Sequence, residues 1–310
     1  NVSMSSKLDL EVPGTTVDRQ CGSSLQAIQF GAQAVMSGTQ DVIISGGVEA
    51  MSTVEIGSNI KDGLANGRGV PKGERLEAQY PGIQFSQFDG AELLAEKYNI
   101  SRDDLDSFGL LSHQRATEAT ENGYFKQEIV PLNIKLQDGS TDIHDVDEGI
   151  RSGATLEAMQ SLNVLREGGV ITAGTASQIS DGAAAIMIAN EGAVKKYDLP
   201  VRAKIHSLAV VGSDPVIMLE GPIPATQKVL EKAGLSIDDI DLYEVNEAFG
   251  SVPLAWAKAL NADLDKLNVN GGAQALGHPL GGTGAKLMTT IVHELERRDA
   301  RYGLIAICEG

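Results

Sequence analysis

The stretch Cys21-Gly-Ser-Ser-Leu-Gln-Ala-Ile-Gln-Phe-Gly-Ala-Gln-Ala-Val-Met-Ser-Gly-Thr-Gln-Asp-Val-Ile-Ile-Ser-Gly-Gly47 decides what fold we expect. Its first half, Ser23 to Ser37, places apolar side chains at helical spacing, and Gly38 is a typical helix stop. Its second half, Asp41 to Ser45, is a short apolar run typical of a buried strand. Because a helix that leads into a buried strand is characteristic of α/β proteins, we expect an α/β fold.

The α/β pattern resumes after residue 180 and continues along the rest of the chain. Apolar runs predict strands, and amphipathic runs that end at glycine predict helices. The strands are expected at 183–189, 201–211, 241–245 and 303–307, and the helices at 224–233, 248–260 and 285–297. The last unit of glycine-rich turn, helix and strand repeats the order of the unit at 21–47, so we expect a duplicated α/β half.

Residues 52 to about 165 differ because they are more polar and contain fewer strand candidates. Within them, Ser101-Arg-Asp-Asp104 is an N-cap with an acidic first turn, which predicts a helix that runs toward Gly123. We therefore expect a mostly helical insertion within an N-terminal half at 1–190, followed by a C-terminal half at 191–310. Both ends of the sequence are abrupt, and we expect segments to be missing from both.

Composition and charge exclude several classes of protein. The formal net charge is −17, whereas a protein that grips a nucleic-acid backbone needs a basic face. The chain has no apolar run of about 18 residues, so we expect no membrane-spanning helix. It opens without a basic-then-apolar signal region, and we expect a cytoplasmic protein.

The chain has two cysteines, Cys21 and Cys308, too few for a four-cysteine zinc site. Two buried structural thiols and one disulfide are both open interpretations, although a reducing cytosol disfavours the disulfide. Cys21 lies at the start of the predicted helix, where unpaired N–H groups and the helix dipole lower the pKa of a thiol. It is therefore a candidate nucleophile, with a small buried side chain as the alternative.

The run Asn270-Gly-Gly-Ala-Gln-Ala-Leu-Gly-His-Pro-Leu-Gly-Gly-Thr-Gly284 holds a histidine between a glycine and a proline. Glycines at this density let a backbone approach a ligand closely. The run is neither a P-loop, because no Gly-Lys-Ser/Thr ends it, nor a dinucleotide fingerprint. His278 in this rigid turn is a candidate site residue. The remaining histidines are expected to be structural or exposed: His113, His144, His206 and His293.

Two further polar positions follow predicted strands. Asn246, in Glu244-Val-Asn-Glu-Ala-Phe249, lies where a strand meets a helix, and ligands bind at strand ends in α/β folds. Its amide can position a water or donate to an oxyanion, and capping the helix is the alternative interpretation. Cys308, in Ile307-Cys-Glu-Gly310, follows the last predicted strand, and a buried structural thiol is again the alternative.

Together these motifs resemble those of the thiolase family, in the family's order. The family's nucleophile motif is similar to Arg19-Gln-Cys-Gly-Ser-Ser-Leu25, and Gly46-Gly-Val-Glu-Ala-Met-Ser52 is similar to another family signature. The family's Asn-Glu-Ala-Phe, Gly-His-Pro and Cys-x-Gly motifs match residues 246–249, 277–279 and 308–310. The resemblance runs from about Val12 to Gly310. It implies a thiolase-like α/β fold with five layers, α-β-α-β-α, built from two duplicated halves with a helical loop domain inserted at about 52–165.

By this resemblance, Cys21 is the nucleophile that carries the acyl group, and His278 takes its proton and helps to polarise a carbonyl. Cys308 is the acid and base that moves the proton on the α-carbon. Asn246 holds a water that forms one oxyanion hole with His278. The backbone N–H groups of Cys21 and Gly310 form the other oxyanion hole.

The family's contacts to coenzyme A (CoA) match four positions, which are Arg151, Ala173, Ser177 and Phe249. Arg151 supplies a local positive charge that the net charge of −17 otherwise denies an anionic ligand. The resemblance implies CoA thioesters as substrates and no tightly bound cofactor. It also implies a homodimer or homotetramer, because family members are dimers or tetramers.

The implied activity is CoA-dependent cleavage of a 3-oxoacyl-CoA to acetyl-CoA and a shortened acyl-CoA through an acyl-cysteine, in fatty acid or steroid degradation. The alternative is a biosynthetic acetyl-CoA C-acetyltransferase, which condenses two acetyl-CoA with the same residues. Asn246 and Cys308 disfavour a decarboxylating ketoacyl synthase, and a non-catalytic CoA-ester binding protein is the distant alternative. Ser86-Gln-Phe-Asp-Gly90 replaces a His-Met-Gly segment of acetoacetyl-specific members, which favours a longer or bulkier 3-oxoacyl group.

Overall fold

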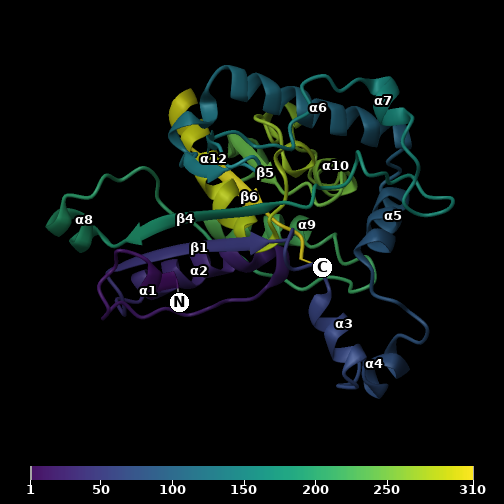
Figure 1. The fold of residues 1–310 in the computed structure, drawn as a ribbon, viewed down its shortest axis with the longest axis horizontal. Helices are drawn as coiled ribbons and strands as arrows, with labels where there is room; N and C mark the ends of the chain where they lie inside the picture. Colours follow the sequence, from purple (N-terminus) through teal and green to yellow (C-terminus); the bar gives the residue numbers. More distant parts are fainter. Residues whose placement is uncertain (1, 310) are drawn as a thin grey trace.

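The computed structural model describes residues 2–309 and builds its core from two small sheets and the helices between and around them (Figure 1). β1 (Val42–Ala50) pairs antiparallel with β4 (Asp181–Ala189). β5 (Leu242–Val245) pairs in parallel with β6 (Gly303–Ala306). Helix α12 (Thr283–Arg298) contacts both sheets, which produces the layered α/β architecture.

Helix α2 (Ser23–Met36) packs on β1 and crosses α12 at close range. A Cβ atom added to Gly284 would lie 2.3 Å from the backbone nitrogen of Leu25, so only glycine permits this approach. The Ala285 N–H donates to the Ser24 hydroxyl at 3.0 Å across the same crossing. The starts of the two helices are thereby fixed against one another.

The helix crossing also brings two short 3₁₀ turns together. The turn η1 (Gln20–Gly22) precedes α2, the turn η5 (Leu280–Gly282) precedes α12, and the two turns are in contact. Strand β1 touches the same place, because a Cβ added to Gly47 would lie 1.8 Å from the carbonyl oxygen of Gly281. Segments from opposite ends of the chain therefore meet in one tightly packed region.

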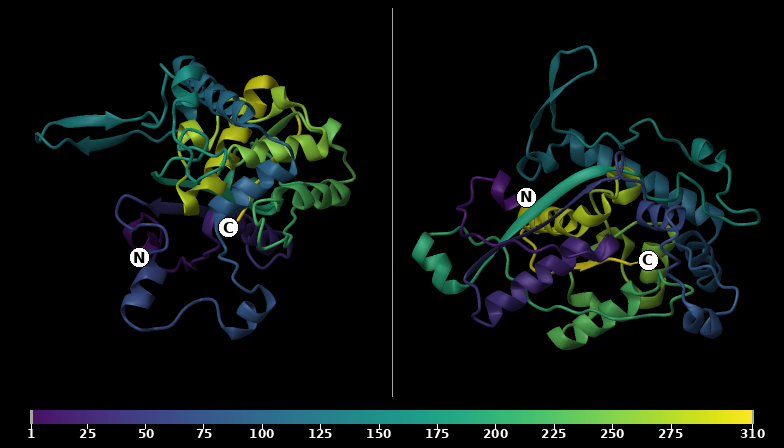
Figure 2. Two further views of the ribbon diagram at one scale, coloured as in Figure 1. Left: turned by 90° about the vertical axis from the view of Figure 1, so that its right-hand side faces the viewer. Right: turned by 60° about the horizontal axis from the view of Figure 1, so that its bottom comes forward.

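The excursion between β1 and β4 is helical, as expected, but it also contains a hairpin that the sequence pattern did not predict. The hairpin pairs β2 (Leu132–Lys135) with β3 (Thr141–His144) and projects from the body of the molecule (Figure 2). Helix α6 (Arg102–Glu121) begins at the predicted cap, where Ser101 and Asp104 form a reciprocal capping box.

The remaining helical elements connect these parts. They are α1 (Val2–Ser5), α3 (Ser58–Ala65), α4 (Glu74–Gln79), α5 (Gln87–Lys97), η2 (Tyr124–Gln127), α7 (Leu156–Gln160), α8 (Glu191–Tyr197), α9 (Pro222–Ala233), η3 (Ile237–Asp239), α10 (Ser251–Leu260), η4 (Leu264–Lys266) and α11 (Ala273–Leu276). Within residues 2–309, no helix combines the length and the apolar character needed to span a membrane.

The strand expected at 201–211 is wrong, because this segment forms no ladder with any described residue. Side chains take up its carbonyl groups instead of a neighbouring strand. Lys232 Nζ donates to the Leu208 carbonyl at 2.7 Å, and Gln29 Nε2 donates to the Ala209 carbonyl at 3.2 Å. An apolar run becomes a strand only where a partner strand is available.

Two other boundaries differ from expectation. β1 does not end at Ser45 but continues through Gly46 and Gly47 to Ala50. The helix expected from residue 248 begins at Ser251, because residues 246–250 are irregular in conformation.

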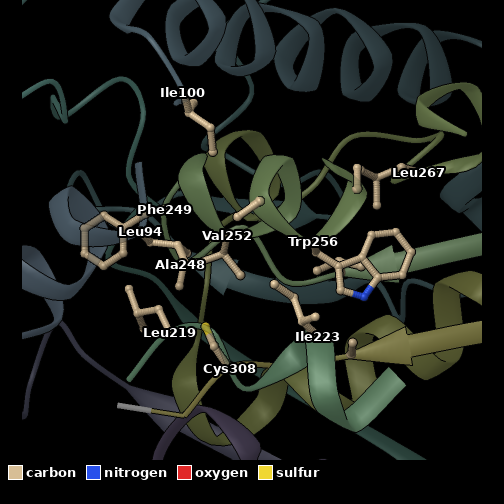
Figure 3. Packing of buried hydrophobic residues seen from close by; sticks show 14 of the residues in the cluster. Leu94, Ile100, Leu219, Ile223, Ala248, Phe249, Val252, Trp256, Leu267 and Cys308 are labelled. Carbon is tan, nitrogen blue, oxygen red and sulfur yellow. The ribbon is translucent and has the colours of Figure 1, made fainter. Parts of the chain in front are cut away.

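The main core lies between the β5–β6 sheet and helices α5, α9 and α10 (Figure 3). Trp256 on α10 is fully buried, and its indole N–H donates to the Thr226 hydroxyl on α9 at 2.8 Å. Its ring meets Tyr243 of β5 edge to face, with ring centroids 5.1 Å apart. Cys308 belongs to this cluster, so one thiol is part of the rigid core.

The β1–β4 sheet presents two unlike faces. One face packs on α2 and α12. On the other face, Ile44 lies opposite Met187 and Val48 lies opposite Ala183, and all four side chains are exposed. Because successive side chains point to opposite faces and both faces are apolar, each of these strands appears as a continuous apolar run in the sequence.

Candidate active site

Cys21 lies on the turn η1, directly before α2, as the sequence predicts. Its side chain is 2% exposed and forms no disulfide. The preceding residue, Gln20, has a φ of 41°, a left-handed conformation that is uncommon for a residue with a side chain. Backbone strain of this kind is concentrated at functional sites, where neighbouring contacts hold it in place.

Cys308 follows β6 and is 1% exposed, and it forms no disulfide either. Burial raises the pKa of its thiol, and the electrostatic influence of Cys21 raises this pKa as well. The loops that carry the two thiols are adjacent, because a Cβ added to Gly22, the residue after Cys21, would lie 3.4 Å from the carboxylate of Glu309, the residue after Cys308. Two thiols from opposite ends of the sequence therefore share one site.

His278 lies in the glycine-rich turn between Gly277, whose φ is 81°, and Pro279. Its ring nitrogens have defined partners: Nδ1 lies 2.6 Å from the Thr283 hydroxyl and Nε2 lies 3.3 Å from Asn246 Nδ2. Burial, together with the charge of nearby Lys286, lowers the pKa of His278 to about 4. The imidazole is therefore neutral at physiological pH and can accept a proton.

Asn246 directly follows β5, and its side chain points at the His278 ring. The alternative role as a helix cap is wrong, because α10 begins at Ser251 and Gly250 is its N-cap residue. The amide oxygen Oδ1 is buried and has no hydrogen-bond partner among the described residues. A buried polar atom without a partner is rare, which marks this position as one where a ligand or water group is expected.

Two residues that sequence reasoning missed connect the thiol-bearing loops. Arg19 Nε donates to the Glu309 carboxylate, and Arg19 Nη1 donates to Gln26 Oε1 at 2.7 Å. This ion pair links the residue two positions before Cys21 with the residue directly after Cys308. Gly310, the predicted oxyanion-hole residue, lies outside the described residues.

Ser177 and Phe249 lie beside the predicted catalytic residues. The Ser177 N–H donates to the Ala248 carbonyl at 3.0 Å, and Ala176 forms a β-bridge with Phe249. The same segment reaches the histidine, since the His278 N–H donates to the Gln178 carbonyl at 3.2 Å. The segment 176–178 therefore joins the asparagine motif to the histidine motif.

Arg151 is held near this segment through its backbone. Its N–H donates to His113 Nδ1 at 3.2 Å, and Gln178 Nε2 donates to the carbonyl of Gly149 at 2.9 Å. The Arg151 side chain is exposed, so its charge faces solvent and is free to meet an anion at the surface. Ala173 lies on an exposed turn, and no polar contact of the described residues connects it to the catalytic side chains.

Glu247 packs against the glycine-rich turn and supports it, and sequence reasoning missed this residue. It is fully buried, and its carboxylate accepts hydrogen bonds from Ser112 at 2.8 Å and from Asn268 at 2.9 Å. Burial raises its pKa despite these donors. A Cβ added to Gly272 would lie 2.2 Å from the Glu247 carboxyl carbon, so the turn needs glycine there.

Two hollows of the molecular surface lie away from this site. The larger, about 420 Å³, is lined by residues between Gly73 and Gln79. The smaller, about 220 Å³, lies between α6 and the end of α12 and is lined by Arg115, Arg297 and Arg298 among others. Neither contains a residue predicted for the catalytic site.

An α/β protein that brings two buried thiols, a neutral imidazole and a primary amide together has the form of a cysteine-dependent acyltransferase. Family models described as "Thiolase, N-terminal domain" and "Thiolase, C-terminal domain" match residues 1–192 and 199–310. The chain belongs to the thiolase family and is an acyltransferase.

Relatives of known sequence agree with this assignment. The chain is 53% identical to the steroid 3-ketoacyl-CoA thiolase FadA6 of Mycobacterium tuberculosis over 302 residues, which is 97% of this chain and 73% of that protein. It is 42% identical to a 3-ketoacyl-CoA thiolase of Serratia proteamaculans, over 100% of this chain and 79% of that protein.

Solved structures confirm the predicted thiolase fold. Human mitochondrial 3-ketoacyl-CoA thiolase matches with a TM-score of 0.87 at 40% identity, over 100% of this chain and 79% of that one. A structure of the human enzyme in complex with CoA matches with a TM-score of 0.85 at 39% identity, over 100% of this chain and 78% of that one. The Bacillus anthracis acetyl-CoA acetyltransferase matches with a TM-score of 0.86 at 35% identity, over 99% of this chain and 79% of that one.

Proposed function

We propose that this chain cleaves a 3-oxoacyl-CoA with free CoA, releasing acetyl-CoA and an acyl-CoA shortened by two carbons. The observation that carries the proposal is the contact between Asn246 and His278 beside two buried thiols, whose neighbours Arg19 and Glu309 form an ion pair. The relatives of known sequence that are named above carry names of 3-ketoacyl-CoA thiolases.

Acylation begins at Cys21. Its proton passes to Nε2 of His278, and the sulfur attacks the keto carbon of the substrate. The imidazole is neutral before the step because burial holds the pKa of His278 at about 4. The proton moves between two buried partners, so an ion pair forms without a net charge being added to the interior.

Carbon–carbon cleavage follows. The bond between the keto carbon and the α-carbon breaks, and its electron pair leaves on the enolate of acetyl-CoA. The Cys308 thiol then gives its proton to the α-carbon, which completes acetyl-CoA and leaves a Cys308 thiolate. Because burial raises the pKa of Cys308, this residue is a protonated thiol before the step and is ready to act as an acid.

The second half-reaction restores the enzyme. The thiol of free CoA gives its proton to the Cys308 thiolate and attacks the acyl group on Cys21. The bond from the acyl carbon to the Cys21 sulfur breaks, and Cys21 recovers its proton from His278. The four transfers move three protons and return every enzyme group to its starting state, so the proposed cycle needs no redox cofactor.

Oxyanion stabilisation belongs on one side to His278 and a water held by Asn246, and on the other side to the backbone N–H groups of Cys21 and Gly310. The amide oxygen Oδ1 of Asn246, unpartnered within residues 2–309, can accept a hydrogen bond from that water, which leaves the second O–H of the water to donate to the oxyanion. Removing one oxyanion-hole donor typically costs about 2.7–4 kcal/mol of transition-state stabilisation.

CoA is the proposed acyl carrier, with Arg151, Ser177, Ala173 and Phe249 as its proposed contacts. The exposed Arg151 side chain provides a cation for CoA phosphates in a chain whose net charge is −17. We also propose a homodimer or homotetramer, two halves divided at about residue 190, and a cytoplasmic location.

The substrate proposed for this chain is a long or bulky 3-oxoacyl-CoA, including a steroid-derived one. Phe88 supports this choice, because it stands in the segment that departs from acetoacetyl-specific members and packs edge to face on Phe249, with ring centroids 5.4 Å apart. The test is CoA-dependent cleavage of a substrate series from acetoacetyl-CoA to steroid-sized 3-oxoacyl-CoA. A kcat/KM that rises with acyl size supports the proposal, and activity confined to acetoacetyl-CoA overturns this choice of substrate.

The biosynthetic acetyl-CoA acetyltransferase is the second candidate function. The structural match to the Bacillus anthracis enzyme with that name favours it. Condensation of two acetyl-CoA in the absence of longer substrates would identify it. A chain that binds CoA esters but neither cleaves nor condenses them would instead be the non-catalytic binding protein.

A further inference from the structure

Thr283 is the first residue of α12, and its hydroxyl lies within hydrogen-bond distance of the buried ring nitrogen Nδ1 of His278. The oxygen Oγ1 lies 2.6 Å from Nδ1 and 2.9 Å from the carbonyl oxygen of Pro279. The Thr283 side chain is buried, so solvent does not compete for either contact. The hydroxyl therefore has two neighbours and one proton.

The two neighbours require the hydroxyl to donate a hydrogen bond on one side and to accept one on the other. The Pro279 carbonyl can only accept a hydrogen bond, so the Thr283 hydroxyl donates its one proton there. Toward His278 the same oxygen then acts as the acceptor, and the ring must carry its proton on Nδ1. In a neutral imidazole, Nε2 is left with a lone pair.

The opposite side of the ring has a donor that fits this assignment. Asn246 Nδ2 can only donate, and it lies 3.3 Å from Nε2. The order of donors therefore runs in one direction, from the Asn246 amide to Nε2 and from Nδ1 through the Thr283 hydroxyl to the Pro279 carbonyl. Each of the four groups satisfies its neighbour without a clash of protons.

Backbone contacts prevent Thr283 from turning away. Its N–H also donates to the Pro279 carbonyl at 2.9 Å, which fixes the start of α12 on the turn that carries His278. The hydrogen bond from the Ala285 N–H to the Ser24 hydroxyl fixes α12 on α2, the helix that follows Cys21. The hydroxyl is thus placed by the same helix crossing that places the nucleophile.

We propose that Thr283 is a positioning residue that holds His278 in the Nδ1–H form and so keeps Nε2 unprotonated, able to accept the Cys21 proton in place of its long 3.3 Å contact with Asn246 Nδ2. The inference rests on the proposed role of His278 as the base. The wrong tautomer would place a proton on Nε2, and a ring protonated there cannot accept another proton at the same atom. Acylation of Cys21 is therefore the step that depends on Thr283.

The first experiment observes the tautomer directly in the intact protein. Nitrogen-15 labelling of histidine, with long-range proton–nitrogen correlation, distinguishes Nδ1–H from Nε2–H in each neutral ring. The His278 signals are assigned by their loss in the His278→Asn variant. We expect Nδ1–H in the unmodified protein, and a signal for Nε2–H there overturns the proposal whatever the enzyme's substrate is.

The second experiment compares Thr283→Val, which removes the hydroxyl but keeps the shape, with Thr283→Ser, which keeps the hydroxyl. We expect Thr283→Val to lower the rate of Cys21 acylation roughly ten- to a hundredfold, the range for losing a hydrogen bond to a group that becomes charged. KM for the 3-oxoacyl-CoA should change little, and part of the His278 population should move to Nε2–H. Thr283→Ser should retain both the rate and the tautomer.

These outcomes separate the inference from the proposed function. If Thr283→Val keeps the full acylation rate while His278→Asn loses it, the base assignment stands and the role of Thr283 falls. If His278→Asn is fully active, the proposed function of the histidine falls first. Should Thr283→Val fold poorly in thermal melting, the tautomer of the unmodified protein and the rate of Thr283→Ser still decide the question.

Discussion

Cys21 and Cys308 differ in what surrounds them, and this difference assigns their chemistry. Cys21 precedes a helix start and lies close to the polar pair formed by Arg19 and Glu309. Cys308 packs within the main apolar cluster, which also contains Leu219 (Figure 3). An apolar surrounding disfavours a thiolate, so Cys308 is suited to hold a proton and Cys21 to give one up.

Replacement of the nucleophile should stop the reaction. We expect Cys21→Ala to abolish both cleavage and condensation, because no acyl-enzyme can form without its sulfur. CoA binding should persist, since the proposed CoA contacts are on other residues. Turnover assays combined with calorimetric titration of CoA check both statements, and normal turnover in this variant would remove Cys21 from its assigned role.

Replacement of the second thiol should separate the two half-reactions. We expect Cys308→Ala to block condensation and to slow cleavage, because the α-carbon loses its acid and base. The acyl group should still reach Cys21, and mass spectrometry of the intact protein can measure the added mass. Loss of acylation together with turnover would mean that Cys308 acts earlier in the cycle than proposed.

At this scale the sequence predicted the side chains proposed to react but not the residues that hold them. His278 and Asn246 could be predicted because a rigid glycine–proline turn and a strand end are local patterns. Thr283 could not be assigned a role, because its importance lies in which atom of a neighbouring ring it faces. The Arg19–Glu309 pair joins residues almost a chain length apart, and no periodicity or motif reports such a contact.

Among the elements, the crossing of α2 and α12 sets the geometry of the site. Helix α2 follows the nucleophile, and α12 begins at Thr283, directly after the turn that carries the histidine. The helices can approach this closely because Gly284 has no side chain. Any group that spreads the crossing would therefore move the nucleophile away from the base.

A methyl group at this crossing should be destabilising. We expect Gly284→Ala to lower the free energy of unfolding by about 1–3 kcal/mol, the usual cost of overpacking a close contact. Turnover should fall as well, because the two helix starts would separate. Chemical denaturation and kcat measure the two effects.

The matched control for this change is Gly63→Ala in α3. An added Cβ at Gly63 meets no atom within 4 Å, so the change should be neutral or raise stability by about 0.5–1 kcal/mol through helix propensity. Equal effects of the two substitutions would contradict the close approach of α2 and α12.

Helices were predicted better than strands, for a physical reason. A helix satisfies its hydrogen bonds within one segment, so a local cap such as Ser101 or a stop such as Gly234, with a φ of 67°, is enough to locate it. A strand depends on a partner elsewhere in the chain. The segment 201–211 has strand-forming residues but no strand to pair with. The residues of β2 and β3 form strands less readily, yet each of these segments has the other as a partner.

For the molecule as a whole, burial favours the protonated form of some carboxyl groups. This makes the charge of the folded protein less negative than the formal net charge of −17. Burial raises the pKa of Glu128 to about 7, and it also raises the pKa values of Glu244 and Glu247. A carboxyl with a raised pKa binds a proton in the folded state that the unfolded chain has already released. For Glu128, the stability that this proton contributes is present below about pH 4.5 and is lost as pH rises toward about 7.

Neutralising Glu128 should therefore stabilise the protein in a pH-dependent way. We expect Glu128→Gln to raise the free energy of unfolding by about 2–3 kcal/mol at about pH 8, and by much less at about pH 5. The amide oxygen can still accept the bond from the Thr290 hydroxyl, which is 3.1 Å long in the carboxylate form. The exposed Glu121→Gln is the control, and a gain for Glu128→Gln that is equal at both pH values would mean that burial does not govern this group.

The proposed site combines Cys21 with His278 and Cys308, so it can form only after all three residues have been synthesised. On the ribosome, Cys21 is synthesised first, and the proposed base His278 and the second thiol Cys308 follow 257 and 287 residues later. At about 5–20 residues per second, the nascent polypeptide carries an unactivated thiol for tens of seconds. If the proposed roles hold, a nascent chain that does not yet contain His278 and Cys308 cannot complete the cycle, and catalytic competence arises only after both have been synthesised.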